Sequence, residues 1–397
     1  MKKEILENAL KSSKNMIIKG DIKSGKTRKV MFPIVSSLIN NNENLLILDN
    51  KEEYLNNYYD SLIENNYNVV IVNLKDYSAS EGFNPLEYPA RLYKNGKKDE
   101  ALDILEMLNS NIFHDNSESD PFWSLSASDF VTALGLSLFE DASLDEVNYK
   151  NISILFNECD TKFGASNYMS SYIKHKGTQS SIYTYASGTV LAPNETKGGI
   201  LSTARQKIRQ LTSRDELSKL MSKTTFSLDA CLTKKTAIII IAKDEETGVN
   251  KLASMLISEV YKIIASNKQG LKWNFILDNF DSIDYISNLN DMYKSSYVYN
   301  TKIYVCIKSL NELTRLYGSY ISELADIIDA NQYTIIDDEI DENYKNSNIK
   351  YPHPNIADIK YVKFIDILKK LKIKELVSTE DLINRIDKKL QELEEEK

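Results

Sequence analysis

The chain has 397 residues, of which 49 are basic and 57 acidic, and its formal net charge is −8. This length suits two domains or one domain with a large insertion, and a hydrophobic fraction of 42% is typical of a globular chain, which excludes a disordered one. The longest unbroken apolar run, 237–242, falls far below the roughly 18 residues that cross a bilayer, so we expect no direct membrane insertion.

The first 90 residues alternate between short apolar runs and stretches with helical spacing. Apolar runs lie at 15–19, 45–49 and 68–74, and helical spacing occurs at 28–39 and 54–63. Short buried strands separated by amphipathic helices are typical of a parallel sheet with crossover helices. We therefore predict an α/β fold with a mostly parallel central sheet.

The middle of the chain is predicted to be helical throughout. Apolar residues at helical spacing occur at 101–108, 127–138, 152–156, 180–191 and 199–211, and none of these stretches has the pattern of a strand. We predict that residues 97–223 form an inserted all-helical domain.

Strand-like runs then resume and alternate again with helices. The predicted strands are 236–242, 273–278, 302–307 and 333–337, and the predicted helices are 249–265, 283–294 and 310–317. Residues 1–96 and 224–345 are thus expected to form two parts of one α/β domain. Residues 346–397 form a C-terminal extension, in which 378–397 has the pattern of an amphipathic acidic helix.

A phosphate-binding motif lies between the first apolar run and the first helix. Residues 20–27 fit the P-loop pattern GxxxxGK[ST] in full, with Gly20, Asp21, Ile22, Lys23, Ser24, Gly25, Lys26 and Thr27. The glycines let the backbone turn its N–H groups toward a phosphate, the lysine reaches the β- and γ-phosphates, and the threonine hydroxyl binds Mg²⁺. The sequence therefore predicts ATP and Mg²⁺ as cofactors of this α/β domain.

A P-loop also needs an acid at the end of a second buried strand to hold the magnesium ion. Asp278 follows the run 273–277 and is our preferred candidate, so we predict Thr27 and Asp278 as the metal-binding pair. Asp49 ends a run of the same shape and is the alternative. In the larger P-loop class an extra strand lies between the two motif strands and the metal acid is reached only after that strand, so Asp49 comes too early in the chain.

The predicted catalytic residues depart from the usual chemistry. The residue after the metal acid should be a glutamate that activates water, but here it is Asn279, whose amide takes no proton. Asp281, three residues after Asp278, is a candidate to replace it. Lys308, at the tip of the run 302–307, is either a γ-phosphate sensor or a solvated lysine. Together with Asp278 these residues are the predicted catalytic set.

Seven motifs, in one order along the chain, resemble those of the TraG/TraD-type coupling proteins of conjugation and type IV secretion. They are the P-loop with VMFP at 30–33, LDNKEE at 48–53, FNPL at 83–86, DPFW at 120–123, ETKGGILSTA at 195–204, LDNF at 277–280 and KSLNEL with LYG at 308–318. The resemblance covers about residues 15–320. It implies a RecA-like P-loop ATPase that assembles into a hexameric ring and feeds a DNA–protein substrate to an export channel.

The same resemblance implies three partners: other subunits of the ring, a relaxase and single-stranded DNA. It also implies a cytoplasmic protein that reaches the inner face of the membrane through its partners. Three features depart from the family. Its members usually carry N-terminal transmembrane helices, whereas this chain begins close to the P-loop strand; Asn279 replaces the catalytic glutamate, and Lys308 replaces a glutamine. The alternatives are a hydrolysis-deficient nucleotide-binding adapter of the same apparatus and an unrelated P-loop motor.

Aromatic and basic residues of the predicted helical domain allow two interpretations. Phe122 and Trp123 either stack on single-stranded bases or pack between helices. Arg205 or Arg209 is a candidate arginine finger across a subunit interface, and Arg315, after the helical domain, is a third.

Overall fold

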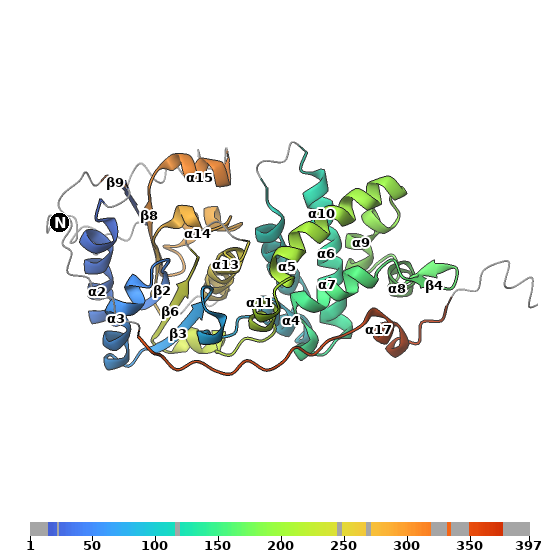
Figure 1. Ribbon diagram of the computed structural model, residues 1–397, viewed down its shortest axis with the longest axis horizontal. Coiled ribbons are helices and arrows are strands. Elements are labelled where there is room, and N and C mark those ends of the chain that lie inside the picture. Colours follow the sequence, from blue (N-terminus) through green and yellow to red (C-terminus); the bar gives the residue numbers. More distant parts are fainter. Residues whose placement is uncertain are drawn as a thin grey trace, which may run out of the picture.

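The chain folds into two lobes that lie side by side, a sheet lobe and a helical lobe (Figure 1). The structure is a computed structural model that describes residues 15–21, 24–115, 120–243, 248–266, 271–318, 332–334 and 349–375. Ile22 and Lys23 of the P-loop, and the predicted acidic helix at 378–397, lie outside the described residues.

The sheet lobe is built on seven strands that all run parallel. Their order is β3-β6-β2-β7-β8-β1-β9, and each neighbouring pair is parallel, which confirms the predicted α/β class. β8 lies between β1 and β7 in the sheet, as expected of an extra strand between the two motif strands, but it follows Asp278 in the chain, so the expectation that the metal acid comes only after this strand was wrong. The bounds are β1 Met16–Lys19, β2 Asn44–Leu48, β3 Asn68–Asn73, β6 Thr236–Ile241, β7 Trp273–Leu277, β8 Thr301–Ile307 and β9 Gln332–Thr334.

Helices cover both faces of this sheet, which explains why its strands read as continuous apolar runs. Successive side chains of a strand point to opposite faces. In β2, Leu45 and Ile47 pack with helices α2 (Phe32–Asn40) and α3 (Glu53–Glu64), while Leu46 and Leu48 belong to the core that contains α13 (Lys251–Ser266) and α14 (Leu289–Ser295). A strand buried on both faces needs no polar alternation.

The helical lobe consists of helices packed around α6, which contacts α4, α5, α7, α9 and α10. Among the described residues, α6 is the one helix long and apolar enough to cross a membrane, and 67% of its most apolar stretch is buried inside the protein. One prediction was wrong here, because two short strands form an antiparallel pair between α7 and α8. The bounds are α4 Glu87–Lys94, α5 Lys98–Phe113, α6 Phe122–Asp141, α7 Tyr149–Glu158, β4 Lys162–Phe163, β5 Ser166–Asn167, α8 Tyr168–Lys176, α9 Ser181–Val190, α10 Asn194–Thr212 and α11 Asp215–Leu220. The next helix, α12 (Leu228–Thr233), leads into β6 and packs on α13 of the sheet lobe.

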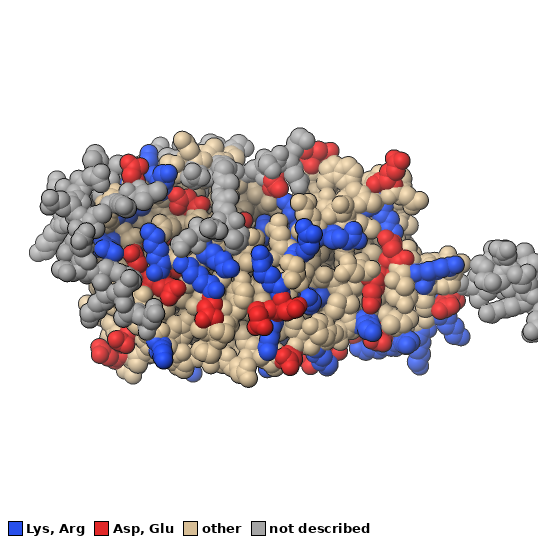
Figure 2. Space-filling view, viewed as in Figure 1, with Lys and Arg blue, Asp and Glu red and all other residues tan. Residues whose placement is uncertain are grey.

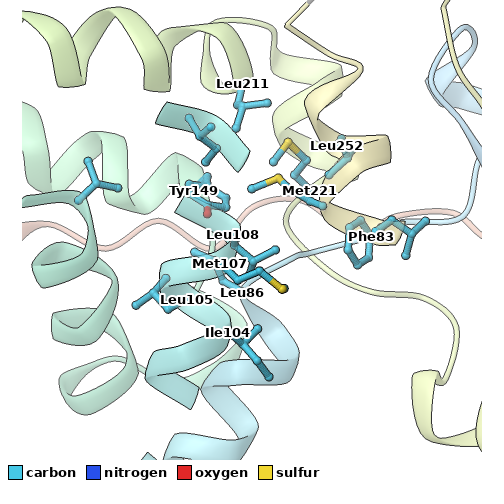
Figure 3. Close-up of a cluster of buried hydrophobic side chains, with 14 of the residues drawn as sticks. Phe83, Leu86, Ile104, Leu105, Met107, Leu108, Tyr149, Leu211, Met221 and Leu252 are labelled. Atoms are coloured by element: carbon cyan, nitrogen blue, oxygen red, sulfur yellow. The ribbon is translucent and has the colours of Figure 1, made fainter. Parts of the chain in front are cut away.

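One hydrophobic core runs through the junction of the two lobes. Figure 3 shows side chains of the connecting segments, such as Phe83 and Met221, beside Met107 of α5 and Leu252 of α13. The chain passes from the sheet lobe to the helical lobe near Phe83 and returns near Leu220. A hydrogen bond joins these two segments, because the Phe83 N–H donates to the Leu220 carbonyl (3.0 Å). The FNPL motif therefore lies in the segment that leaves the sheet lobe, and it contacts the segment that returns to that lobe.

Asn84 of that motif has a bonding role at the junction. Its side-chain amide donates to the carbonyls of Val147 (2.7 Å) and Ser222 (3.2 Å), and its carbonyl accepts the Leu86 N–H (3.1 Å). Because the side chain is buried, all of these bonds are shielded from water. The asparagine thus fixes the outgoing segment against the returning one.

The predicted helix 283–294 is wrong over its first half. Regular helix begins only at Leu289, and the preceding residues are irregular, with Ile283 in an extended conformation. Ser287 donates its N–H to the Asn111 side chain of α5 (2.7 Å) and its hydroxyl to the Met107 carbonyl (3.1 Å). Bonds to the other lobe take the place of bonds along a helix.

The segment 349–375 forms a strap that crosses both lobes, drawn in red along one side of Figure 1. At the sheet lobe, the Tyr351 hydroxyl donates to the Ala79 carbonyl (2.9 Å). At the helical lobe, Asn151 donates to the Lys360 carbonyl (2.8 Å) and accepts the Val362 N–H (3.2 Å). The strap ends in α17 (Phe364–Lys370), which packs on α7 and α8.

At two adjacent glycines of α10, substitution by alanine is expected to have opposite effects on stability. A Cβ atom at Gly198 meets nothing within 4 Å, whereas one at Gly199 meets the Trp123 ring at 2.4 Å. Gly198→Ala should raise the free energy of unfolding by up to about 1 kcal/mol through helix propensity. Gly199→Ala should lower it by about 1–3 kcal/mol through overpacking. Urea unfolding measures both.

The emission of Trp123 gives an independent check. The chain has two tryptophans, and Trp273 is fully buried in β7. Gly199→Ala should change tryptophan emission in the folded state because the ring that it displaces is Trp123, and Gly198→Ala should not. Equal stability and emission in the two variants contradict the packing of Trp123 on Gly199.

Candidate active site

The P-loop follows β1 at the carboxyl edge of the sheet. The Gly20 N–H continues the ladder by donating to the Ile307 carbonyl of β8 (3.2 Å). Gly25 has φ +81°, in the left-handed region that favours glycine because it has no Cβ. The motif's second glycine is therefore required by the backbone path, as the sequence predicts.

The helix after the loop begins with a π-helical turn, η1 (Lys26–Met31), which leads into α2. The Phe32 N–H donates to the Thr27 carbonyl, five residues back. Pro33 follows, and it has no N–H to donate and a ring that crowds the preceding turn. The wider turn places the proline in the first turn of α2, where a missing N–H costs little.

Two buried polar groups of the loop are suited to an anionic ligand. Lys26 is 9% exposed, and its ammonium donates to the carbonyls of Gly20 (2.5 Å) and Asp21 (2.9 Å). Ser24 is 2% exposed, and within the described residues its hydroxyl has no hydrogen-bond partner. A buried hydroxyl without a partner is rare, and a phosphate oxygen satisfies it. The residues present therefore fit the polyphosphate of a nucleotide.

The structure brings the predicted metal pair into direct contact. The Thr27 hydroxyl donates to Oδ2 of Asp278 (2.6 Å), although the two residues are 251 positions apart. Asp278 follows β7 and is buried. Its Oδ1 accepts the Asn279 N–H (2.9 Å), and its Oδ2 also accepts the Tyr54 hydroxyl (2.8 Å). A threonine hydroxyl and a carboxylate are oxygen ligands that suit Mg²⁺.

The alternative acid, Asp49, has a different use. Its two carboxylate oxygens accept the N–H groups of Glu53, Tyr54 and Leu55 in the first turn of α3, at 2.9–3.0 Å, and a longer one from Lys51. Burial raises the pKa of Asp49 to about 7, while these backbone bonds act in the opposite direction. The carboxylate is thus engaged by the start of a helix.

Asn279 occupies a backbone position that suits its residue type. Its φ is +47°, a region in which asparagine is enriched among residues other than glycine. Its carbonyl accepts the Ser282 N–H (2.9 Å) and hydroxyl (2.6 Å), which closes a tight turn directly after the metal acid. The turn directs the next residues of the chain toward β8.

The other two predicted catalytic residues lie together. Oδ2 of Asp281 accepts the backbone N–H of Lys308 (3.2 Å), and the Lys308 side chain is exposed. The loop after β7 and the tip of β8 are therefore joined, because β7 and β8 are neighbouring parallel strands. Asp281 thus bonds to the strand tip, while Asp278 contacts the P-loop.

Sequence reasoning missed two side chains near Asp278. Tyr54 was expected only as an apolar member of the helix 54–63, yet its hydroxyl reaches Asp278, 224 positions away. Cys306 of β8 is fully buried, and burial and the nearby Asp278 carboxylate raise the pKa of its thiol. Neither residue carries a sequence signal for this contact, because it depends on how α3 and β8 pack around β7.

The residues suggested for DNA contact and two of the three candidate arginine fingers lie in the helical lobe, while Arg315 belongs to α15 (Leu310–Tyr317), after β8. Trp123 packs over Gly199 and is 37% exposed, so one part of its ring is used in packing. The Arg205 guanidinium lies over the Phe156 ring (5.4 Å), and Arg209 is exposed. The side chain of Arg315 lies outside the described residues. On the face drawn in Figure 2, basic and acidic side chains are interspersed.

Comparisons with known proteins bear on the family and the fold of the chain. The sequence pattern of the family described as type IV secretory system conjugative DNA transfer matches residues 9–345. A structure of the bacterial conjugative coupling protein TrwBdeltaN70 is similar with a TM-score of 0.55 at 13% identity, over 80% of this chain and 66% of that chain. None of the curated proteins matches the sequence.

Two further structures are of the plasmid coupling protein TrwB with nucleotides. The complex with the ATP analogue ADPNP has a TM-score of 0.55 at 13% identity, over 80% of this chain and 68% of that one. The complex with ADP and Mg²⁺ has the same TM-score and identity, over 83% and 70%. The chain thus spans about two thirds of these relatives, and the likeness shows a RecA-like P-loop NTPase fold.

The bonding of Asp49 predicts a pH dependence of stability. Its pKa in the folded protein is about 7, above the ordinary value of 3.8. Between pH 3.8 and about 7, the side chain therefore carries a proton in the folded protein but has lost it in the unfolded chain. The free energy of unfolding, relative to Asp49→Asn, should therefore fall as pH rises from about 4 to about 7, by up to about 1.4 kcal/mol per pH unit. Urea unfolding of both proteins at several pH values measures it. A difference that stays constant over this range contradicts the prediction.

Proposed function

The chain belongs to the type IV secretory system conjugative DNA transfer family, and from this we propose that it is a coupling ATPase of a conjugation or type IV secretion apparatus. In this function it binds Mg²⁺-ATP and links a DNA–protein substrate to the export channel. The observation that carries the Mg²⁺-ATP site of this proposal is the direct hydrogen bond between Thr27 of the P-loop and Asp278 after β7.

The residues of the site divide into two groups by what they hold. The P-loop residues 20–27 hold the phosphates: backbone N–H groups, the Lys26 ammonium and the Ser24 hydroxyl supply donors. Thr27 and Asp278 hold the metal. Bound Mg²⁺ neutralises charge on the phosphate oxygens during phosphoryl transfer. The TrwB complexes with ADPNP and with ADP and Mg²⁺ support this division by analogy.

A second candidate function rests on the residue after the metal acid. Asn279 orients a water but takes no proton from it, and Lys308 is a cation where the family has a neutral amide. Loss of a general base typically lowers a rate by about 10²–10⁴. The alternative is therefore a hydrolysis-deficient, nucleotide-binding adapter or regulatory subunit of the same apparatus.

The partners follow from the proposed function. We propose self-association into a ring, a relaxase-bearing substrate, single-stranded DNA and a position at the inner face of the membrane through partner proteins. The interspersed charges in Figure 2 favour DNA contact at a confined surface, such as a ring lumen, over contact on this whole face. We also propose that 97–223 acts as an inserted helical domain within a nucleotide-binding domain formed by 1–96 and 224–345, with 346–397 as an extension.

Lys26→Ala tests whether the chain has the nucleotide site that both candidate functions require. Removing the buried ammonium should abolish binding of a fluorescent ATP analogue and all phosphate release, because the phosphates lose their main cationic partner. The control is Lys174→Ala, which removes an exposed lysine from α8 of the helical lobe. Release is measured with and without single-stranded DNA, and particle size with and without Mg²⁺-ATP.

The outcome decides between the candidates. Release that depends on Lys26 supports the coupling ATPase, and micromolar binding without release supports the adapter. Binding that survives Lys26→Ala, or that is lost equally in Lys174→Ala, overturns the proposed site.

Asp281 is the proposed replacement for the missing glutamate. Asp281→Ala should abolish residual phosphate release and leave binding of the ATP analogue intact. Asp281→Asn keeps an acceptor for the Lys308 N–H but removes the base, so it should lower release by about 10²–10⁴ as well. A normal rate in Asp281→Asn, with loss only in Asp281→Ala, shows that the residue fixes the strand tip instead.

A further inference from the structure

We propose that Tyr54 is the positioning residue of the metal-binding carboxylate: its hydroxyl holds Asp278 in the orientation in which it binds Mg²⁺ beside Thr27. This inference rests on the proposed function, because it concerns how the chain binds Mg²⁺-ATP. Its starting observation is the 2.8 Å hydrogen bond from the Tyr54 hydroxyl to Oδ2 of Asp278, the same oxygen that accepts the Thr27 hydroxyl.

The carboxylate is restrained from three sides. Thr27 approaches from the P-loop helix, Tyr54 from α3 and the Asn279 N–H from the turn after β7. Two donors on Oδ2 and one on Oδ1 fix the rotation of the carboxylate about its own bond. Of these donors, Thr27 is itself a proposed metal ligand, and the backbone N–H belongs to the loop that carries Asp278. Two side-chain donors come from outside the metal pair, the Tyr54 hydroxyl and the Cys306 thiol, and of the two the thiol is only a weak donor.

The position of Tyr54 is itself fixed. Its backbone N–H donates to the Asp49 carboxylate (2.9 Å), which binds the first turn of α3. Its ring is buried and meets the Phe32 ring edge-on, with centroids 5.1 Å apart and an angle of 74° between the planes. A buried phenol needs an acceptor, and the one that it contacts is Asp278. The LDNKEE motif and Tyr54 thus connect the end of β2 to the metal acid.

The chemistry of the phenol suits this role. Burial, the Asp278 carboxylate and the surrounding negative groups raise the pKa of Tyr54 well above its ordinary value. The hydroxyl therefore acts as a neutral donor toward Asp278. A neutral donor orients the carboxylate without removing the negative charge that the metal requires.

Tyr58 provides a matched control in the same helix. It lies one turn further along α3, and its ring meets the same Phe32 ring edge-on at 5.5 Å and 85°. Its hydroxyl, however, donates to the Phe32 carbonyl (2.7 Å) and lies 3.0 Å from the Ser36 hydroxyl, both in α2. Tyr58→Phe therefore removes the same group from the same aromatic cluster and leaves the donors of Asp278 in place.

The experiment titrates Mg²⁺ against each protein with a fluorescent ATP analogue held at constant concentration. Tyr54→Phe should need about 10- to 100-fold more Mg²⁺ for half-maximal enhancement of binding, the usual effect of losing a residue that orients a metal ligand. Affinity for the analogue without Mg²⁺ should stay within about 2-fold, because the phosphate donors are unchanged. Tyr58→Phe should match the wild-type protein in both measurements.

A double-mutant cycle tests whether the effect passes through Asp278. In the background of Asp278→Asn, Tyr54→Phe should have no further effect on the Mg²⁺ requirement, because the carboxylate that it orients is gone. Additive effects of the two substitutions overturn the inference, as does a wild-type Mg²⁺ requirement in Tyr54→Phe or an equal shift in Tyr58→Phe. Those results leave the proposed function intact. A wild-type protein that binds no ATP analogue at any Mg²⁺ concentration overturns the proposed function and this inference with it.

Discussion

The structure depends on the contact between Thr27 and Asp278, which joins the P-loop to the end of β7. In a parallel sheet, every strand ends at the same edge, so residues that come after different strands meet there whatever their separation along the chain. The strand β8 lies between β1 and β7 and sets the distance that the loops must bridge. The order of the strands in the sheet therefore brings together Thr27, from the first tenth of the chain, and Asp278, from its last third.

Two carboxylates with the same sequence context take different places in this arrangement. Asp49 and Asp278 each come after an apolar strand, and β2 and β7 are direct neighbours in the sheet. After Asp49, three residues lead into α3, whose first N–H groups bind its oxygens. Asp278 is followed by a tight turn, which leaves its oxygens facing the P-loop helix and Tyr54. The helix or turn after each strand decides which acid contacts the P-loop.

The helical lobe is joined to the site through the loop after β7. Ser287 bonds to Asn111 and Met107 of α5, and Tyr285 stacks on His114 at the end of the same helix, with ring centroids 3.6 Å apart. The shared core at Phe83 and the strap 349–375 connect the lobes at other points. The loop that follows Asp278 is therefore held against α5 by both packing and hydrogen bonds.

The sequence alone determined the parallel sheet and the P-loop, because apolar runs and glycine spacing are local patterns. The local pattern did not separate Asp278 from Asp49, since both acids end apolar strands, and the contact of Asp278 with the P-loop was decided by the tertiary structure. The sequence also indicated that residue 279 lacks a base. Tertiary structure decided the rest. The predicted helix 283–294 loses its first half to bonds with Asn111, the short pair β4–β5 interrupts the helical lobe, and Pro33 is accommodated by a π-helical turn. Tyr54 acquires its contact with Asp278 only when α3 packs beside α2 on the sheet. Such contacts join residues hundreds of positions apart, and no local pattern encodes which distant partner a side chain will meet.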